Sequence, residues 1–263
     1  MTQIVFDDRA AQQLDAMYRT RDVVYRRRLV REALAPAIGQ RVLDVGCGPG
    51  FCTAQLLADV GPSGEVVGID TSPAMLEAAA RRCDGLGSVS FHLGDATQLP
   101  LQDYAFDRAL CVQVLEFVLD VPAALRELYR VLRPGGRVLI WDVDWSTLSW
   151  HSANPARMRT MLSAWDRHLT HPALPRVLAP ALRSAGFTDI RVEGHAFVTT
   201  ALDPETYGGA ALGNVQRYLG GLPELDQAEV QAWADEQRDL GSRGEYFYAV
   251  IQACFTATRP PTV

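Results

Sequence analysis

A glycine-rich turn directly after an apolar stretch is the feature of this chain best suited to hold a ligand. Residues 41–50 read Arg-Val-Leu-Asp-Val-Gly-Cys-Gly-Pro-Gly, and a helical pattern begins at Thr53. Glycines lack a Cβ, so their backbone can approach a bound molecule closely and adopt dihedral angles that other residues avoid. Gly46, Gly48 and Gly50 follow the spacing Gly-x-Gly-x-Gly, which differs from the Gly-x-Gly-x-x-Gly typical of dinucleotide sites.

Polar side chains follow the next three predicted strands, at the point where each strand ends. They are Asp70, Asp95 and Gln113. Asp70 comes about twenty residues after the glycine turn, where a carboxylate can accept hydrogen bonds from both hydroxyls of a ribose. Each acid taken alone could be a helix cap or a turn residue. Their joint occurrence at successive strand ends favours a ligand site, because ligands bind at the carboxyl ends of parallel strands.

These motifs carry a family resemblance. Together with the acid before it, Asp44-x-Gly-x-Gly-x-Gly resembles the first motif of the class I S-adenosylmethionine-dependent methyltransferases. The resemblance covers about residues 38–145 and includes residues 114–117. Through residues 130–136 it is similar to the ubiquinone/menaquinone-type and sterol-type small-molecule branch. Relatives often carry a histidine where this chain has Phe117, so any role of that histidine cannot be transferred.

The resemblance implies a cofactor, S-adenosylmethionine, and a product, S-adenosylhomocysteine. It places Asp70 on the ribose, Asp95 and Ala96 on the adenine, and Gln113 beside the sulfonium and its methyl. An arginine or tyrosine of the N-terminal helix meets the cofactor's carboxylate in many relatives, although an arginine-rich solvated face is an alternative interpretation. The expected cofactor-binding residues are Tyr18, Arg27, Asp44, Gly46, Gly48, Gly50, Asp70, Thr71, Met75, Asp95, Ala96 and Gln113.

The acceptor side has weaker signals. His151 follows the fifth strand and is the best-placed candidate for a general base, with His195 on the sixth strand as the second candidate. A surface histidine is the alternative for His151. Trp141 is interpreted as a core residue, and Trp145 as either core or acceptor wall. His168-x-x-His171 has no partner motif, so we expect no metal site.

The expected reaction is transfer of the methyl group to a small organic acceptor, at carbon, oxygen or nitrogen, by in-line displacement. This chemistry needs alignment and exclusion of water more than a covalent nucleophile. The alternative is a non-catalytic or repurposed S-adenosylmethionine-binding protein. A nucleotide-linked oxidoreductase is disfavoured by the glycine spacing and by Asp95.

Composition narrows the partners. The chain has 263 residues and a net charge of −6, which provides no basic field for nucleic acid or an anionic membrane. All basic residues are arginine, so lysine chemistry is excluded. The 5 cysteines form no Cys-x-x-Cys pair, and no apolar run approaches the length of a membrane span. We expect a cytoplasmic protein without a signal peptide that binds neither nucleic acid nor membrane, with a homodimer as a candidate assembly.

Alternating strand and helix patterns indicate the fold that positions these residues. We expect an α/β fold with a doubly wound, seven-stranded, mostly parallel sheet, the Rossmann-like methyltransferase fold, whose last strand is antiparallel. The expected strands are 41–46, 65–70, 89–94, 106–112, 137–143, 188–199 and 246–258. The expected helices are 10–35 (one helix or a pair), 53–60, 73–83, 121–132, 155–169, 175–185, 203–219 and 226–240.

The chain is expected to form a single methyltransferase domain, residues 1–263. Residues 1–38 would form a helical cap and residues 39–145 the cofactor-binding core. Residues 146–200 and 245–263 would complete the sheet layer. Residues 201–244 separate the last two strands by far more than an ordinary connection, and we expect them to form a helical lid over the acceptor pocket.

Overall fold

The computed structural model describes residues 15–261 of the chain. Its centre is a seven-stranded sheet with the order β3-β2-β1-β4-β5-β7-β6. Strand β7 runs antiparallel to both β5 and β6, and the other pairs are parallel. This confirms the predicted fold, including a sixth strand that runs parallel to the first five. The strands are β1 (Arg41–Val45), β2 (Glu65–Asp70), β3 (Val89–Leu93), β4 (Phe106–Val112), β5 (Leu132–Trp150), β6 (Thr188–Thr199) and β7 (Tyr248–Thr258).

The helices begin at residues that cap them. Ser72, Asp120, Asn154 and Thr206 each accept a hydrogen bond from a backbone amide of the first helical turn, and proline follows the first three. The helices are α2 (Arg21–Leu34), α3 (Phe51–Val60), α4 (Pro73–Cys83), α5 (Val121–Val131), α6 (Pro155–Trp165), α7 (Pro175–Ser184), α8 (Tyr207–Gly220) and α9 (Gln227–Ser242). Short 3₁₀ turns, η1 (Leu115–Phe117) and η2 (Asp166–His168), follow β4 and α6. The beginning of the predicted 10–35 helix lies outside the described residues.

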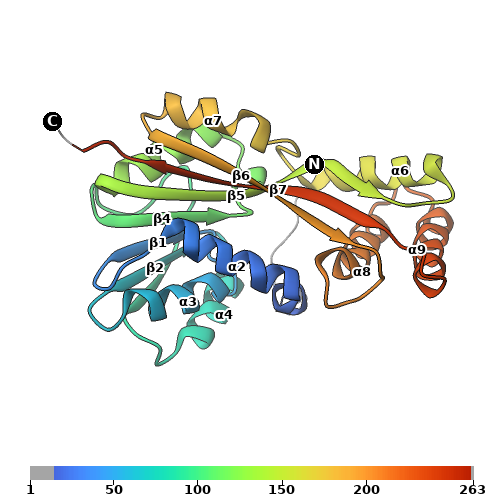
Figure 1. Cartoon of the computed structure of the whole chain (residues 1–263), viewed down its shortest axis with the longest axis horizontal. Helices are drawn as coiled ribbons and strands as arrows, with labels where there is room; N and C mark the ends of the chain where they lie inside the picture. The colour runs from blue at the N-terminus through green and yellow to red at the C-terminus, as the bar shows by residue number, and fades with distance from the viewer. Residues whose placement is uncertain (1–14, 262–263) are drawn as a thin grey trace.

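Helices cover both faces of the sheet. Figure 1 shows α5 and α7 on one side and α2, α3 and α4 on the other. Alternate residues of each strand therefore enter different cores: Val42 belongs to the cluster beneath α2 and α3, and Leu43 to the cluster beneath α5 and α7. The carboxyl ends of β1, β2 and β4 meet at one edge, where the glycine turn begins.

Strand β5 is much longer than expected. It was predicted over 137–143, but it begins at Leu132 and ends at Trp150, with a register shift against β7 between Asp144 and Ser149. Strand β5 is extended by its pairing with β7, which no local sequence pattern predicts. The far ends of β5, β6 and β7 project past β4, and α6, α8 and α9 gather around them (Figure 1). Residues 201–244 thus leave the sheet at the expected edge, and their role as a lid stays a prediction.

Candidate active site

The three glycines of the turn have different structural roles. All have positive φ angles, 67° at Gly46, 52° at Gly48 and 80° at Gly50. A Cβ on Gly46 would lie 2.2 Å from a methyl group of Val114, and one on Gly50 would lie 2.8 Å from the Cα of Ala79. These two glycines therefore serve packing within the protein. A Cβ on Gly48 would meet only the hydroxyl of Tyr18, at 3.7 Å, so its open face is the one available to a ligand.

Asp44 stabilises this turn through a side-chain hydrogen bond to α3. Its carboxylate is buried, and its Oδ2 accepts a hydrogen bond of 2.6 Å from the hydroxyl of Thr53 on α3. Burial raises the pKa of Asp44 to about 7. Asp44 therefore ties the strand to the helix on either side of the glycines. The geometry gives it a supporting position and does not place its carboxylate on the open face.

Asp70 lies beside the open glycine. Its Oδ2 accepts a hydrogen bond of 2.9 Å from the amide of Gly48, and its Oδ1 one of 2.9 Å from the amide of Ser72. Burial raises the pKa of Asp70, while these amides act in the opposite direction. Each carboxylate oxygen keeps lone-pair capacity for another donor. Asp70, predicted on the ribose, is thus joined directly to Gly48, predicted to bring the backbone close to the ligand.

The residues expected next to Asp70 and on the adenine lie around the same edge. Thr71 is exposed, whereas Met75 is buried within the first turns of α4. Asp95 is exposed, and its Oδ1 accepts hydrogen bonds from the amide and the hydroxyl of Thr97, at 2.7 and 2.6 Å. Ala96 is buried. Asp95 therefore orders its own loop as well as facing the edge where an adenine would lie.

Tyr18 and Arg27 gather on Phe51, the first residue of α3. The rings of Tyr18 and Phe51 stack with centroids 5.3 Å apart, and the Arg27 guanidinium lies 5.0 Å from the Phe51 centroid. An Nη of Arg27 donates to the carbonyl of Tyr18 at 2.6 Å, and burial lowers the pKa of Arg27. The structure thus brings both residues to the glycine turn, where a cofactor carboxylate is expected.

Gln113 stands at the end of β4 in a strained conformation, with φ of 54°. Its amide donates to the carbonyl of Trp141 at 2.7 Å. Its side-chain oxygen accepts a hydrogen bond from Arg26, and its side-chain nitrogen donates to the hydroxyl of Tyr207 at 3.4 Å. Gln113 therefore links the N-terminal helix to the insertion at the expected position of the reacting methyl group.

Three residues near Gln113 were missed from the sequence. Arg26 lies on the buried face of α2 with Val23 and Val30, a spacing that could have revealed it. Glu116 is the lone acid of an apolar run and is 1% exposed. Tyr207 begins α8 and is buried, and it lies in the stretch 201–244 that was expected only as a lid. These residues lie closer to Gln113 than either predicted catalytic histidine.

His151 directly follows the end of the projecting part of β5. From Ala253, the partner of Asp142, to Phe247, whose carbonyl accepts the His151 amide, β7 advances roughly 20 Å at about 3.4 Å per residue. His151 is therefore displaced from the strand-end edge that holds Gln113. Its predicted role as a base is not supported by this position, because β5 continues well beyond the point where it was expected to end.

His195 is also kept from Gln113. It lies on the edge strand β6, separated from β4 by β5 and β7, a lateral distance of roughly 14 Å at about 4.8 Å per strand. Its ring stacks on Trp141 with centroids 4.7 Å apart. Trp141 is a core residue, as predicted, and donates to Gln252.

In the described residues no group of three or more His, Cys, Asp or Glu could hold a metal ion.

Comparison with known proteins agrees with this geometry. A family profile described as a methyltransferase domain matches residues 43–140, from β1 to β5. An uncharacterised protein of a Streptomyces fradiae transposon is 38% identical over 240 residues, which cover 88% of this chain and 66% of that protein. A demethylmenaquinone methyltransferase of Staphylococcus aureus is 39% identical over 125 residues, covering 48% of this chain and 52% of the relative. This chain thus spans only part of the curated relatives that it matches.

A solved structure extends the likeness to the whole fold. The crystal structure of the [4+2]-cyclase SpnF superposes with a TM-score of 0.60 at 26% sequence identity, covering 91% of this chain and 82% of that chain. Three observations indicate the same family: the order of the strands in the sheet, the contact of Asp70 with the glycine turn, and the match to the methyltransferase domain. Residues 43–140 of this chain form a methyltransferase domain, and the chain has the fold of the class I S-adenosylmethionine-dependent methyltransferases.

Proposed function

We propose that this protein binds S-adenosylmethionine and transfers its methyl group to a small organic acceptor. The observation that carries the proposal is the open face of Gly48 next to the Asp70 carboxylate. A backbone cradle and an acid with free lone pairs suit a ribose and the chain attached to it. Arg27 and Tyr18 would hold the cofactor's carboxylate, and Asp95 and Ala96 its adenine.

The bound cofactor supplies an electrophilic methyl group, and the chain's own residues supply alignment. Gln113, fixed by its amide bond to Trp141, would orient the reacting end. The buried surroundings of Tyr207 and Trp145 would keep water away from it. This arrangement requires no enzyme nucleophile, so positioning accounts for most of the expected rate.

Isothermal titration of the protein with S-adenosylmethionine, S-adenosylhomocysteine and NAD tests the cofactor assignment. We expect binding of the first two and none of NAD. Binding of NAD alone would reject the proposal. Release of S-adenosylhomocysteine in the presence of candidate acceptors then tests turnover.

A repurposed S-adenosylmethionine-binding protein is the second candidate. The observation that favours it is the likeness, over most of the chain, to a protein described as a [4+2]-cyclase. Cofactor binding without release of S-adenosylhomocysteine, across phenols, amines and carbon acids, would favour this candidate over a methyltransferase.

Two proposals concern the surroundings of the protein. A cytoplasmic location is supported by 5 cysteines that are all free, and fractionation of cells would test it. Within residues 15–261 no helix is long and apolar enough to cross a membrane. A homodimer is supported by exposed Val192 and Val198 on the edge strand β6 and Ile251 on β7. Light scattering of the purified chain, compared with Val198→Asp, would test the dimer.

A further inference from the structure

A buried arginine without an ion pair lies beside the proposed methyl position. Arg26 is 2% exposed, and its Nη1 donates to the side-chain oxygens of Gln113 and Gln252. Its Nε has no hydrogen-bond partner. Among residues 15–261 no carboxylate lies close enough to pair with it, although other arginines of α2 such as Arg31 do form ion pairs. A buried charge is costly unless an anion compensates it, so this guanidinium is suited to an anionic ligand group.

Two buried carboxyl groups lie within electrostatic reach of Arg26. Glu116 on η1 and Asp142 on β5 are almost completely buried. Burial raises the pKa of both, the Glu116 charge raises the pKa of Asp142 further, and the Arg26 charge acts in the opposite direction on each. The pKa of Glu116 rises to about 7. Since one positive charge faces two acids, one carboxyl can be ionised while the other holds a proton.

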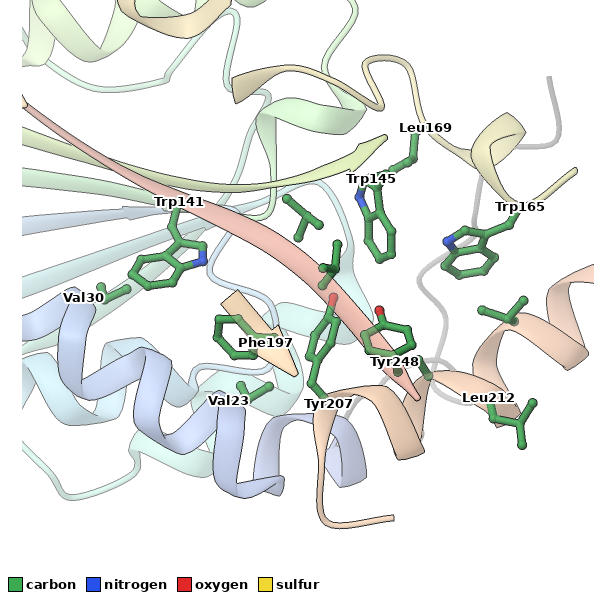
Figure 2. Packing of buried hydrophobic residues seen from close by; sticks show 14 of the residues in the cluster. Val23, Val30, Trp141, Trp145, Trp165, Leu169, Phe197, Tyr207, Leu212 and Tyr248 are labelled. Carbon is green, nitrogen blue, oxygen red and sulfur yellow. The ribbon is translucent and has the colours of Figure 1, made fainter. Parts of the chain in front are cut away.

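Two tyrosine hydroxyls complete the surroundings. Tyr207 feels the charges of both Arg26 and Glu116, and its ring centroid lies 6.3 Å from that of Tyr248. The Tyr248 hydroxyl is buried and has no hydrogen-bond partner. Figure 2 shows the two hydroxyls pointing to the same side, the side from which Trp145 approaches. The Arg26 guanidinium and the Tyr207 hydroxyl therefore lie near the lone acid of η1, and Tyr248 adds a spare donor beside Tyr207. The neighbouring His168 stays neutral, because burial lowers its pKa to about 4.

We propose that Arg26, Glu116 and Tyr207 form the acceptor site, and that the acceptor is an acidic hydroxyl compound, a phenol or an enol. This inference rests on the proposed function and names its substrate class. Arg26 and the Tyr207 hydroxyl hold the oxygen that becomes anionic. The Glu116 carboxylate takes the proton that this oxygen loses. An ammonium acceptor is disfavoured, because the buried Arg26 charge would repel it.

The proton and electrons balance in this step. The acceptor's O–H bond breaks, and its proton forms an O–H bond with Glu116. The electron pair left on the acceptor, at the oxygen or at the conjugated carbon, forms the new bond to the methyl carbon. The methyl–sulfur bond breaks, and its electron pair stays on sulfur, so the sulfonium becomes a neutral thioether. Glu116 later returns its proton to water.

The experiment uses the full chain saturated with S-adenosylhomocysteine, with 4-nitrophenol as the probe at about pH 8, where most of the free probe is phenolate. Visible absorbance reports the bound phenolate, and titration calorimetry in two buffers of different ionisation enthalpy counts protons. We expect uptake of about one proton per phenolate bound, because a second anion beside Glu116 forces that carboxyl to protonate. Glu116→Gln should still bind the phenolate, with proton uptake near zero.

Variants of α2 test the arginine. Arg26→Gln should weaken phenolate binding by about ten-fold to a hundred-fold, the loss expected for a buried charge-assisted hydrogen bond. Arg28→Gln is the matched control, because Arg28 lies on the same helix with 62% of its side chain exposed, and it should bind like the parent. Affinity for S-adenosylhomocysteine is measured for every variant, and phenolate affinities are compared with each variant saturated with it.

Each result decides the inference. Failure of the parent to bind the phenolate, binding without proton uptake, or equal affinities of Arg26→Gln and Arg28→Gln would overturn it, while binding of S-adenosylhomocysteine would leave the proposed function standing. If the parent does not bind S-adenosylhomocysteine, the proposed function fails and this inference fails with it. If Arg26→Gln does not fold, the parent and Glu116→Gln still decide through proton uptake.

Discussion

The indole nitrogen of Trp145 donates a hydrogen bond of 2.8 Å to Oε2 of Glu116, joining the fifth strand to the turn after the fourth. Trp145 is only 8% exposed and packs edge-on against Trp165, yet its polar atom reaches the acid beside the proposed acceptor site. Of the two sequence interpretations of this tryptophan, core is confirmed and acceptor wall stays a prediction. Its ring belongs to the core and its nitrogen orients the acid.

Glu116 should make the stability of the protein fall as the pH rises. Burial raises its pKa from the ordinary 4.5 to about 7, so the folded state binds this proton more tightly than the unfolded state. Its stabilising effect is complete below the unfolded value and is lost as pH rises through the folded value. From about pH 5 to about pH 8 the parent should lose about 1 kcal/mol or more relative to Glu116→Gln. Urea unfolding of both proteins across this range measures the difference, and parallel curves would contradict the expectation.

Asp70→Ala should weaken binding of S-adenosylmethionine by about 1.5–3 kcal/mol, because two charge-assisted hydrogen bonds to the ribose would be lost. The Gly48 amide would lose its acceptor as well. Isothermal titration measures the affinity, with circular dichroism as the check on folding. Asp84→Ala is the control, since Asp84 is exposed at the end of α4. Parent-like affinity of Asp70→Ala would remove Asp70 from the ribose.

Gly48→Val should abolish cofactor binding in a protein that still folds. A Cβ at this position meets only the Tyr18 hydroxyl, at 3.7 Å, so the valine would fill ligand space rather than the core, although its φ of 52° adds strain. Gly50→Val should instead lower stability, because Ala79 occupies the place of its Cβ. Thermal unfolding and titration of both variants check this contrast. Intact cofactor binding by a folded Gly48→Val would refute the assignment of the Gly48 backbone to the cofactor site.

His151→Ala should leave turnover within about two-fold of the parent once an acceptor is found. The side chain is exposed, and its strand has carried it well beyond the edge that holds Gln113. A general base would cost about 10²–10⁴-fold when removed. Steady-state rates of His151→Ala and Glu116→Gln with the same acceptor compare the two assignments. A loss confined to His151→Ala would restore the original prediction.

The sequence predicted best where local patterns act alone. The bounds of β2, β4, α4 and β6 agree with the structure, because an apolar run or a helical stripe ends there at a turn or a cap. The cofactor residues could be named one by one because their motif is local, and their contacts with a cofactor stay predictions. The acceptor residues could not be named in this way. Gln252 meets Arg26 across 226 residues of sequence, and no local signal announces that contact.

Arg26 shows the physical reason for the misses. An arginine among three consecutive arginines is normally solvated, and that expectation outweighed its helical spacing with Val23 and Val30. Glu116 was noted only as part of the family resemblance over residues 114–117, and no role was predicted for it. Its burial depends on Trp145 and on Asp142, which arrive from a strand whose length is set by β7. The burial of Arg26 and of Glu116 therefore depends on contacts between segments that are distant in sequence.

The lid prediction can now be made specific to one end of the insertion. The Arg21 guanidinium pairs with Asp203 at 2.9 Å, and the Tyr207 amide donates to the carboxylate of Asp22 at 2.7 Å. The start of α8 is thereby fastened to the N-terminal helix beside Gln113. Helix α9 packs instead against α6 and α8. The part of the insertion that responds to ligand should therefore be residues 201–212 rather than the whole of it.

Hydrogen exchange followed by mass spectrometry measures this response. With S-adenosylmethionine bound, we expect slower exchange in residues 15–34 and 201–212 and little change in residues 227–242, because only the first two meet the site. Asp22→Ala should reduce the added protection at 201–212 by releasing the Tyr207 amide, while Glu32→Gln, an exposed change on the same helix, should not. Unchanged protection across both 15–34 and 201–244 would rule out the lid and leave the insertion as a helical appendage available for contacts between copies.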